Sequence, residues 1–138
     1  MGILKKSTKP NVPDSHEDLL EKSGFAHLAT LGSDGSPQST PMWYAWDGQN
    51  LLFSTFKGRQ KHRNLIRDPR VAVSITDPDN PYRYMQVQGI ATIEDAADDG
   101  LISALVQKYV GEAASPWDEP GSERVVVRVE IERTSCFG

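Results

Sequence analysis

Tight-turn signals at short intervals constrain the fold of this chain more than any other feature of its sequence. Two Asp-Gly pairs, at 34–35 and 47–48, separate three short apolar runs at 25–31, 38–46 and 51–55. Glycine adopts the positive φ angles of two-residue hairpins, so this arrangement indicates antiparallel strands joined by hairpins. The opening part of the chain is therefore predicted to be a β-meander. Pro41 places the second strand at a sheet edge or a bulge, because proline has no N–H for the ladder.

The rest of the chain alternates short helices with further strands. Apolar and polar residues alternate from Met85 to Glu94, and this period of two indicates a half-buried strand. The expected elements are helices after Ser15 and over 59–67 and 95–110, and strands over 71–76, 85–94 and 125–131. No β-α-β repetition is present, which disfavours a doubly wound nucleotide-binding sheet. Together these elements predict a mainly β protein with short helices, built as a six-stranded antiparallel barrel.

Size and composition narrow the class further. The chain has 138 residues, enough for one domain. Residues 1–13 are polar and contain two prolines, so they are predicted to be a flexible arm before a single domain over 14–138. The net charge of −4 disfavours a nucleic-acid binder, since such domains are usually basic. A lone cysteine, with no signal peptide, membrane-spanning run or metal-ligand spacing, predicts a cytoplasmic protein without a metal site.

Basic residues are concentrated between 57 and 70. This segment carries six lysines and arginines against one acidic residue, Asp68. It follows Ser54 and Thr55 at an expected strand-to-helix junction, where free backbone N–H groups and the positive end of the helix dipole attract phosphate. Hydroxyls and cations there can add charge-assisted hydrogen bonds. The alternative is a solvated basic face, because four arginines recur at helical spacing: Arg59, Arg63, Arg67 and Arg70.

The same segment carries a family resemblance. Residues 53–71 resemble the cofactor-phosphate segment of the pyridoxamine 5′-phosphate oxidase-like superfamily, a group of split β-barrel flavoproteins. Residues 25–44 resemble the family's opening hairpin and 84–93 its strand ending in glycine, so that the likeness covers residues 14–135. The resemblance implies an FMN-binding split barrel that forms a homodimer with its cofactors at the interface.

Within the superfamily, the chain resembles the short members that use the deazaflavin coenzyme F420. The grounds are the run Arg59-x-Lys61-x-Arg63-Asn64-Leu65 and the strand Thr40-Pro41-Met42-Trp43-Tyr44. True pyridoxamine phosphate oxidases carry a C-terminal arginine and histidine that hold pyridoxal phosphate, whereas this chain ends in Arg133-Thr-Ser-Cys-Phe-Gly138. The resemblance therefore implies coenzyme F420, with FMN as the alternative, and argues against vitamin B6 oxidation.

The resemblance also implies roles for individual residues. The cofactor's phosphate is expected to be held by Ser54, Thr55, Arg59 and Lys61, with Gln60 contributing through its backbone. The ring is expected to be lined by Gln38, Ser39, Thr40, Pro41, Met42 and Trp43. The partner subunit is expected to complete the site with Tyr84 and Gln86, for which core or ladder packing is the alternative.

Other polar and aromatic residues receive structural readings. His27 and His62 are predicted to be hydrogen-bonded structural histidines, and His16 is predicted to be exposed. Trp117 lies in a proline-containing acidic stretch, which is predicted to be either a lid over the substrate or a mobile loop.

The implied activity is that of a reductase in which the cofactor carries the chemistry. Reduced F420 would deliver a hydride from ring carbon C5 to a conjugated C=C bond or a quinone-like small molecule, so that no side chain is needed as a nucleophile. The alternatives are an FMN-dependent oxidoreductase of the same fold and a non-catalytic cofactor or haem carrier. Nucleic-acid binding through residues 57–70 is the least favoured.

Overall fold

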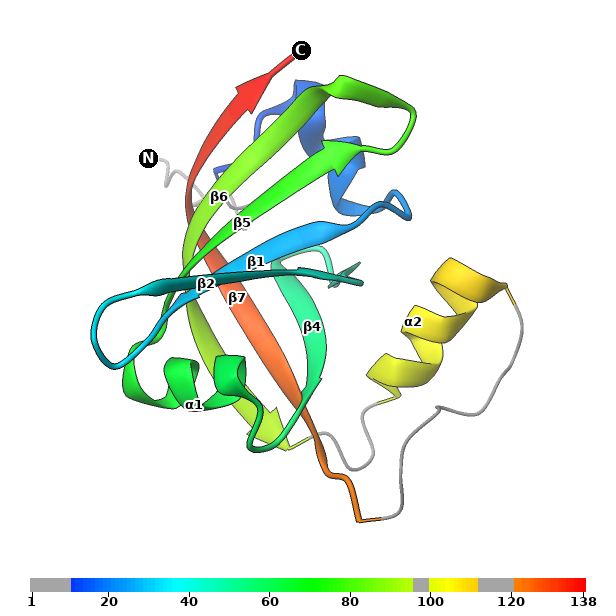
Figure 1. The fold of residues 1–138 in the computed structure, drawn as a ribbon. Helices are drawn as coiled ribbons and strands as arrows, with labels where there is room; N and C mark the ends of the chain where they lie inside the picture. The colour runs from blue at the N-terminus through cyan, green and yellow to red at the C-terminus, as the bar shows by residue number, and fades with distance from the viewer. Residues whose placement is uncertain (1–10, 96–99, 112–120) are drawn as a thin grey trace, which may run out of the picture.

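One curled antiparallel sheet forms the body of the protein. The computed structural model describes residues 11–95, 100–111 and 121–138. Within these residues the sheet has seven strands in the order β2-β1-β5-β6-β7-β4-β3. Their bounds are β1 Ala26–Leu31, β2 Pro37–Met42, β3 Ala45–Trp46, β4 Asn50–Phe56, β5 Arg70–Asp77, β6 Asn80–Asp95 and β7 Arg124–Phe137. The sheet curls into a half-barrel whose two edge strands do not pair (Figure 1).

Three helices lie against this sheet in the described part of the chain. The 3-10 helix η1 spans Asp14–Leu20, α1 spans Gln60–Arg67, and α2 spans Leu101–Val110. In Figure 1, α1 covers one end of the half-barrel and α2 stands beside β4, with the end of β2 pointing toward it. The predicted helix over 95–110 is thus present from Leu101, while residues 96–99 lie outside the described residues.

The hairpin predictions are confirmed. Gly35 and Gly48 have φ values of 83° and 95°, in the left-handed region that glycine adopts without strain. Asp34 Oδ1 accepts a hydrogen bond from the backbone N–H of Ser36, which closes the first turn. Pro41 lies in β2, and β2 is an edge strand, as the missing N–H predicted.

The predicted strand over 38–46 is wrong in one respect, because it divides into β2 and β3 and raises the strand count from six to seven. The division falls at Trp43 and Tyr44, which contact helices instead of a neighbouring strand. The Tyr44 hydroxyl donates to the carbonyl oxygen of Leu19 in η1 at 2.6 Å, and its side chain is fully buried. Its backbone N–H donates to the Tyr109 hydroxyl in α2 at 3.2 Å.

The longest strands, β6 and β7, form the spine of the sheet and extend beyond the predicted ranges. Their pairing shifts by one residue between Gln88 and Gly89. A Cβ atom at position 89 would collide with the carbonyl oxygen of Glu130, so only glycine allows the two strands to approach so closely here. The bulge strengthens the local twist and helps to curl the sheet.

The start of the described chain is fixed to the end of β7. The Asn11 side chain donates to the carbonyl oxygen of Glu132, its own carbonyl oxygen accepts from Thr134 Oγ1, and Val12 packs against the core. Residues 1–10 of the predicted arm lie outside the described residues. No helix in the described ranges is long and apolar enough to cross a membrane.

Two of the three histidine predictions are wrong. His16 is 5 % exposed, because its ring nitrogens contact the Ser15 hydroxyl at 2.8 Å and the Phe137 carbonyl oxygen at 2.9 Å. His27 is exposed on β1, and its ring has no hydrogen bond within the described residues. His62 is structural as predicted, since its Nδ1 accepts the Gly58 N–H at 3.0 Å.

Candidate functional site

A pocket of about 360 Å³ opens where the half-barrel is not closed by strand pairing. It lies between the end of β2 and β4, with the start of α1 on one side and α2 on another. Its lining residues are Phe25, Pro41, Met42, Trp43, Ser54, Thr55, Phe56, Arg59, Lys61, Ile102, Leu105, Val106 and Arg124. The volume is in the range of small-molecule sites, which begins at about 300 Å³.

The start of α1 presents unpaired backbone donors to this pocket. Arg59 is the N-cap, and no side chain caps the helix. The first hydrogen bond of the helix runs from the Arg63 N–H to the Arg59 carbonyl, so the N–H groups of residues 60–62 have no acceptor within the helix. The first turn contains no acidic residue. This end of α1 therefore has the properties of an anion site.

The six cations of the basic segment 57–70 divide into two sets. Four of them have partners in the protein: Lys57 with Glu123, Arg63 with Gly58 and Gln60, Arg67 with Leu31 and Asn64, and Arg70 with Asp68. Arg59 and Lys61 line the pocket, and neither has a carboxylate partner among the described residues. Among the described residues, the two cations proposed from the sequence for a phosphate are thus the two of the six whose side chains have neither a hydrogen bond nor an ion pair.

Lys61 and Arg59 lie close enough at the pocket for their charges to interact. Burial, together with the neighbouring charge of Arg59, lowers the pKa of Lys61 below its usual 10.5. An anion bound beside these two groups would relieve their mutual repulsion. The Arg59 guanidinium lies 5.1 Å from the centre of the Phe56 ring, which restrains it next to the pocket.

Two residues of this polar region were not predicted from the sequence. Arg124 pairs with Phe56 across β7 and β4, and its guanidinium lies 4.3 Å from the centre of the Phe56 ring. Its Nη1 donates to Ser54 Oγ at 3.0 Å. Arg124 and Phe56 reach the pocket through strand register between distant segments, for which the sequence contains no local signal.

The opposite wall of the pocket is apolar. Ile102, Leu105 and Val106 line it from α2. Trp43 closes the wall from the β2 side, and its ring stacks on that of Tyr109 with centroids 4.9 Å apart and planes 3° apart. The pocket thus has a polar half that suits an anionic group and an apolar half that suits a flat or hydrocarbon group.

The structure brings seven of the predicted site residues to this pocket: Pro41, Met42, Trp43, Ser54, Thr55, Arg59 and Lys61. Gln38, Ser39 and Thr40 lie farther back along β2 and do not line it. The Oγ1 atom of Thr40 is buried and has no hydrogen-bond partner in the described part of the chain. A buried hydroxyl without a partner is uncommon in folded proteins and is consistent with a group that binds along this strand.

The remaining predicted site residues do not line the pocket with their side chains. Gln60 is the first residue of α1, and its backbone N–H, the group expected to contribute, has no acceptor within the helix; its side chain bonds Asn64 and Arg63. Tyr84 and Gln86 lie on β6, and the Tyr84 ring stacks on Phe137 with centroids 5.8 Å apart. Neither residue lines the pocket of their own chain. Trp117, predicted to lie in a lid or mobile loop, is outside the described residues.

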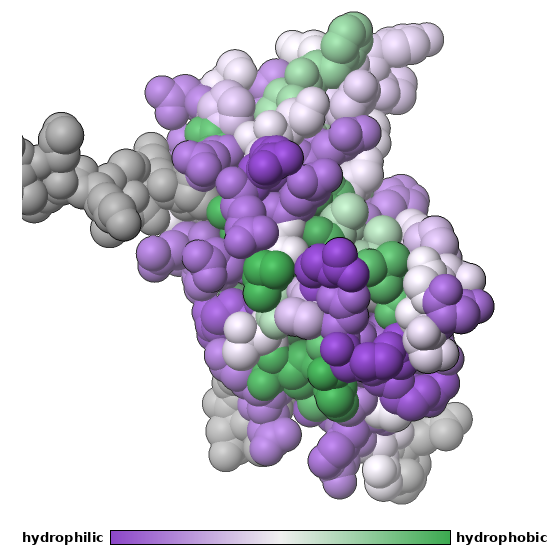
Figure 2. All heavy atoms as spheres, turned by 90° about the vertical axis from the view of Figure 1, so that its left-hand side faces the viewer, coloured by the Kyte–Doolittle hydropathy of each residue, from purple (hydrophilic) through white to green (hydrophobic). Residues whose placement is uncertain are grey.

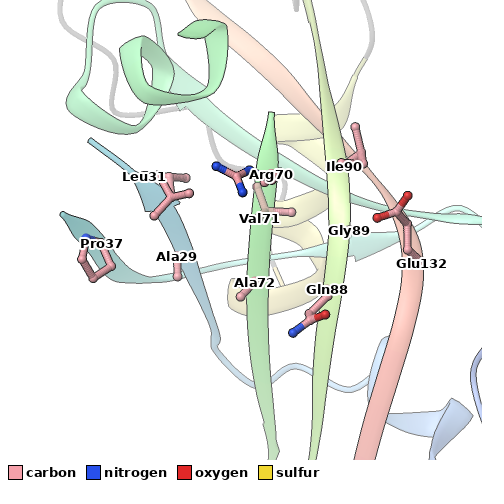
Figure 3. A pocket seen from close by; sticks show the side chains of 11 residues that line it. Ala29, Leu31, Pro37, Arg70, Val71, Ala72, Gln88, Gly89, Ile90 and Glu132 are labelled. Atoms are coloured by element: carbon pink, nitrogen blue, oxygen red, sulfur yellow. The ribbon is translucent and has the colours of Figure 1, made fainter. Parts of the chain in front are cut away.

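A second hollow, of about 460 Å³, lies on the outer face of the sheet. Its lining residues come from five neighbouring strands, β2, β1, β5, β6 and β7. Figure 3 shows one or more from each strand, among them Pro37, Ala29, Ala72, Ile90 and Glu132. Figure 2 shows the face of the molecule that lies on the left in Figure 1, where apolar patches are interspersed with hydrophilic side chains. Small apolar residues on an exposed sheet face are typical of a contact surface.

The placement of the histidines and acidic residues bears on metal and haem binding. No group of three or more His, Cys, Asp or Glu side chains within the described ranges could hold a metal ion. None of the three histidines lines the pocket between β2 and β4. Both ring nitrogens of His16 have partners, as does Nδ1 of His62.

Comparison with known proteins places this geometry in a family. The family model described as pyridoxamine 5′-phosphate oxidase matches residues 12–136. A solved structure named F420 reductase is 40 % identical, with a TM-score of 0.78, and the match covers 90 % of this chain and 98 % of that chain. A conserved hypothetical protein from Mycobacterium tuberculosis is 28 % identical, with a TM-score of 0.71, and the match covers 97 % of this chain and 89 % of that one.

A putative pyridoxamine 5′-phosphate oxidase from Listeria innocua shares the fold at 22 % identity and a TM-score of 0.68, covering 89 % of this chain and 95 % of its own. The family model spans nearly the whole described chain, and the curled sheet agrees with it. This protein belongs to the pyridoxamine 5′-phosphate oxidase family and has its split-barrel fold.

Proposed function

We propose that the protein is a coenzyme F420-dependent reductase that transfers a hydride to a conjugated C=C bond or a quinone-like small molecule. The observation that carries the proposal is the pair Arg59 and Lys61, which stand without carboxylate partners among the described residues at the uncapped start of α1. The 40 % identity to an F420 reductase over 90 % of the chain supports the choice of cofactor.

The residues of the pocket fit a cofactor that joins a phosphate to a planar ring. Arg59 and Lys61 would bind the phosphate, together with the free N–H groups at the start of α1 and the hydroxyls of Ser54 and Thr55. The start of α1, which no side chain caps among the described residues, leaves room for a bound polar group. When bound in its reduced form, F420 supplies a hydride from C5 of its ring.

The chain's own part is to bind, orient and exclude water. Trp43 and the α2 residues Ile102, Leu105 and Val106 surround the apolar half of the pocket and keep water away from a ring or an acceptor held there. The described residues of the pocket include no Ser-His or Cys-His pair. The proposal requires none, since the cofactor carries the reacting atom.

The active form is proposed to be a homodimer with the cofactor at the interface. The apolar hollow on the outer face of the sheet offers a contact surface for a second copy (Figure 3). Tyr84 and Gln86 lie on β6, one of the strands that form this hollow. In a dimer they can therefore face the partner's cofactor, although they do not line the pocket of their own chain.

The experiment that tests the cofactor proposal is equilibrium binding of the purified apoprotein to F420 and to FMN, followed by fluorescence. We expect F420 to bind more tightly, and reduced F420 then to be oxidised when conjugated enones or quinones are added. Preference for FMN would replace the proposal with an FMN-dependent oxidoreductase of the same fold. Binding of neither would overturn both and favour a carrier of another ligand.

A further inference from the structure

Tyr109 of helix α2 forms hydrogen bonds to two other segments of the chain. The Tyr109 hydroxyl donates to the carbonyl oxygen of Gly24 at 2.6 Å and accepts the N–H of Tyr44 at 3.2 Å. It thereby joins α2 to Gly24, just before β1, and to the link between β2 and β3. A phenol held at both its donor and its acceptor has little rotational freedom.

The ring of Tyr109 fixes a second ring, that of Trp43. The two are parallel to within 3°, with centroids 4.9 Å apart. Trp43 lines the pocket, whereas Tyr109 does not. Tyr109 therefore covers one face of the indole from outside the pocket and sets the plane of the side chain that a ligand would meet.

The cation of Lys108 reinforces this arrangement. Its Nζ donates to the carbonyl oxygen of Tyr44 at 2.7 Å and lies 4.1 Å from the centre of the Tyr44 ring and 5.1 Å from that of Tyr109. Lys108 and Tyr109, two consecutive residues of α2, thus both form hydrogen bonds with the backbone of Tyr44, in the link between β2 and β3. Such support makes a binding wall rigid before the ligand arrives, which reduces the entropy lost on binding.

We propose that Tyr109 is a positioning residue for the planar ring of the ligand, acting through Trp43. This inference rests on the proposed function, because it assumes that a planar cofactor or acceptor occupies the apolar half of the pocket. It assigns to α2, a helix with no role in the phosphate site, the task of setting the orientation of that ring.

A thermodynamic cycle on cofactor affinity tests the proposal. Tyr109→Leu removes the stacked ring, and we expect the dissociation constant of F420 to rise roughly two- to tenfold, the scale of one aromatic pair. Tyr109→Phe keeps the ring, and its dissociation constant should remain within about twofold of that of the wild type.

In a Trp43→Leu background, Tyr109→Leu should have no further effect on the dissociation constant, because the indole through which Tyr109 acts is gone. Tyr82→Leu is the matched control, since Tyr82 is 79 % exposed and does not line the pocket.

A second readout needs no cofactor. In a Trp46→Phe, Trp117→Phe background only Trp43 fluoresces, and we expect acrylamide to quench it more strongly once Tyr109→Leu uncovers one indole face. Tyr109→Met, which keeps more of the volume, replaces the leucine variant if that one does not fold. Tyr109→Phe provides a test that depends on neither the leucine nor the methionine variant. If Tyr109→Phe lost as much affinity as Trp43→Leu, the proposal would be overturned.

The outcomes separate this inference from the proposed function. If the wild type binds neither F420 nor FMN, the proposed function fails, and the role of Tyr109 fails with it. If the wild type binds F420 but the effects of Tyr109→Leu and Trp43→Leu simply add, the proposed function stands and the positioning role is overturned. Unchanged affinity in a folded Tyr109→Leu variant has the same consequence.

Discussion

The Nδ2 atom of Asn64 lies 3.0 Å from Thr30 Oγ1, and both side chains are almost completely buried. This hydrogen bond joins α1 to β1 and so fixes the helix whose first turn carries Arg59 and Lys61. Asn64 also accepts hydrogen bonds at Oδ1 from Gln60 and Arg67, so its amide is satisfied on both sides. The geometry of the candidate anion site therefore depends on a buried amide one to two turns away.

We expect Asn64→Ala to lower the free energy of unfolding by ~1–3 kcal/mol, because it leaves the Thr30 hydroxyl buried without its partner. Urea denaturation followed by circular dichroism measures the change. The double variant Asn64→Leu, Thr30→Val should lose less than the two single substitutions together, since both polar groups are then removed. Additive losses would show that the hydrogen bond is not the source of the effect.

Arg59→Ala and Lys61→Ala should each weaken F420 binding by ~1–3 kcal/mol, the usual scale for charge-assisted hydrogen bonds. Arg70→Ala is the matched control, because Arg70 lies in the same basic segment but is engaged by Asp68 at 2.7 Å. Isothermal titration calorimetry or cofactor fluorescence measures the dissociation constants. Equal losses for all three variants would indicate a diffuse charge effect, and unchanged affinity for Arg59→Ala and Lys61→Ala would remove the phosphate-site proposal.

The lowered pKa of Lys61 gives this binding a pH dependence. Burial and the charge of Arg59 move the pKa of the ammonium below its usual 10.5, so the cation is lost at a lower pH than in an exposed lysine. Affinity for an anionic cofactor should therefore fall as the pH rises toward 10. Lys61→Arg keeps its charge throughout this range. The ratio of the two dissociation constants, measured from pH 7 to 10, cancels the titration of the cofactor, and a ratio independent of pH would contradict the prediction.

At the other end of the half-barrel, Asp77 at the end of β5 links Lys22, in the segment after η1, to Arg83 in β6. Asp77 is only 4 % exposed, and its carboxylate accepts hydrogen bonds from Lys22 at 2.9 Å and from Arg83 at 2.8 Å. The hydrogen bond from Lys22, the backbone N–H of Asp79 and the hydrogen bond from Arg83 hold the pKa of Asp77 well below its ordinary 3.8. The stabilisation is therefore complete above the unfolded-state pKa and is lost as the pH falls through the folded-state pKa.

Asp77→Asn should accordingly be less stable than the wild type at pH 7, and the difference should shrink as the pH falls below about 4. Urea unfolding at several pH values measures both curves. Asp79→Asn is the control, because Asp79 contacts the same lysine but is mostly exposed. A difference between wild type and Asp77→Asn that is constant from pH 7 to 2 would contradict the assignment.

Features encoded by neighbouring residues could be predicted from the sequence. The two Asp-Gly turns predicted the meander, and Pro41 predicted the sheet edge, because each depends on the φ angle or N–H of one residue. The concentration of cations at a helix start could be predicted for the same reason, since both lie in one short segment. Which cations remain available could not be predicted, because it depends on the separate partners of Arg63, Arg67 and Arg70.

Features set by contacts between distant segments were missed. The break at Tyr44 depends on Leu19 and Tyr109, and Arg124 reaches the pocket only through its pairing with Phe56. His16 was predicted to be exposed because it lies in a polar stretch. It is buried, and its ring contacts the carbonyl oxygen of Phe137 at the far end of the chain. Each case requires the register or packing of elements more than 20 residues apart, which a single sequence does not specify locally.

The outer hollow leads to the last prediction, on assembly. Ala72 lies on the exposed face of β5 inside this hollow, between Ala29 on β1 and Gln88 on β6 (Figure 3). If a second copy covers the hollow, Ala72→Glu places a carboxylate in an apolar contact, and because a two-fold interface repeats every residue, it does so twice. We expect the wild type to sediment as a dimer and Ala72→Glu to shift toward monomer.

Ala104→Glu is the matched control on the exposed face of α2, outside both hollows, and should remain dimeric. A monomeric wild type, or a dimer unaffected by Ala72→Glu, would show that this face does not hold a second copy, and the pocket between β2 and β4 would then have to bind its ligand without the partner's Tyr84 and the partner's Gln86.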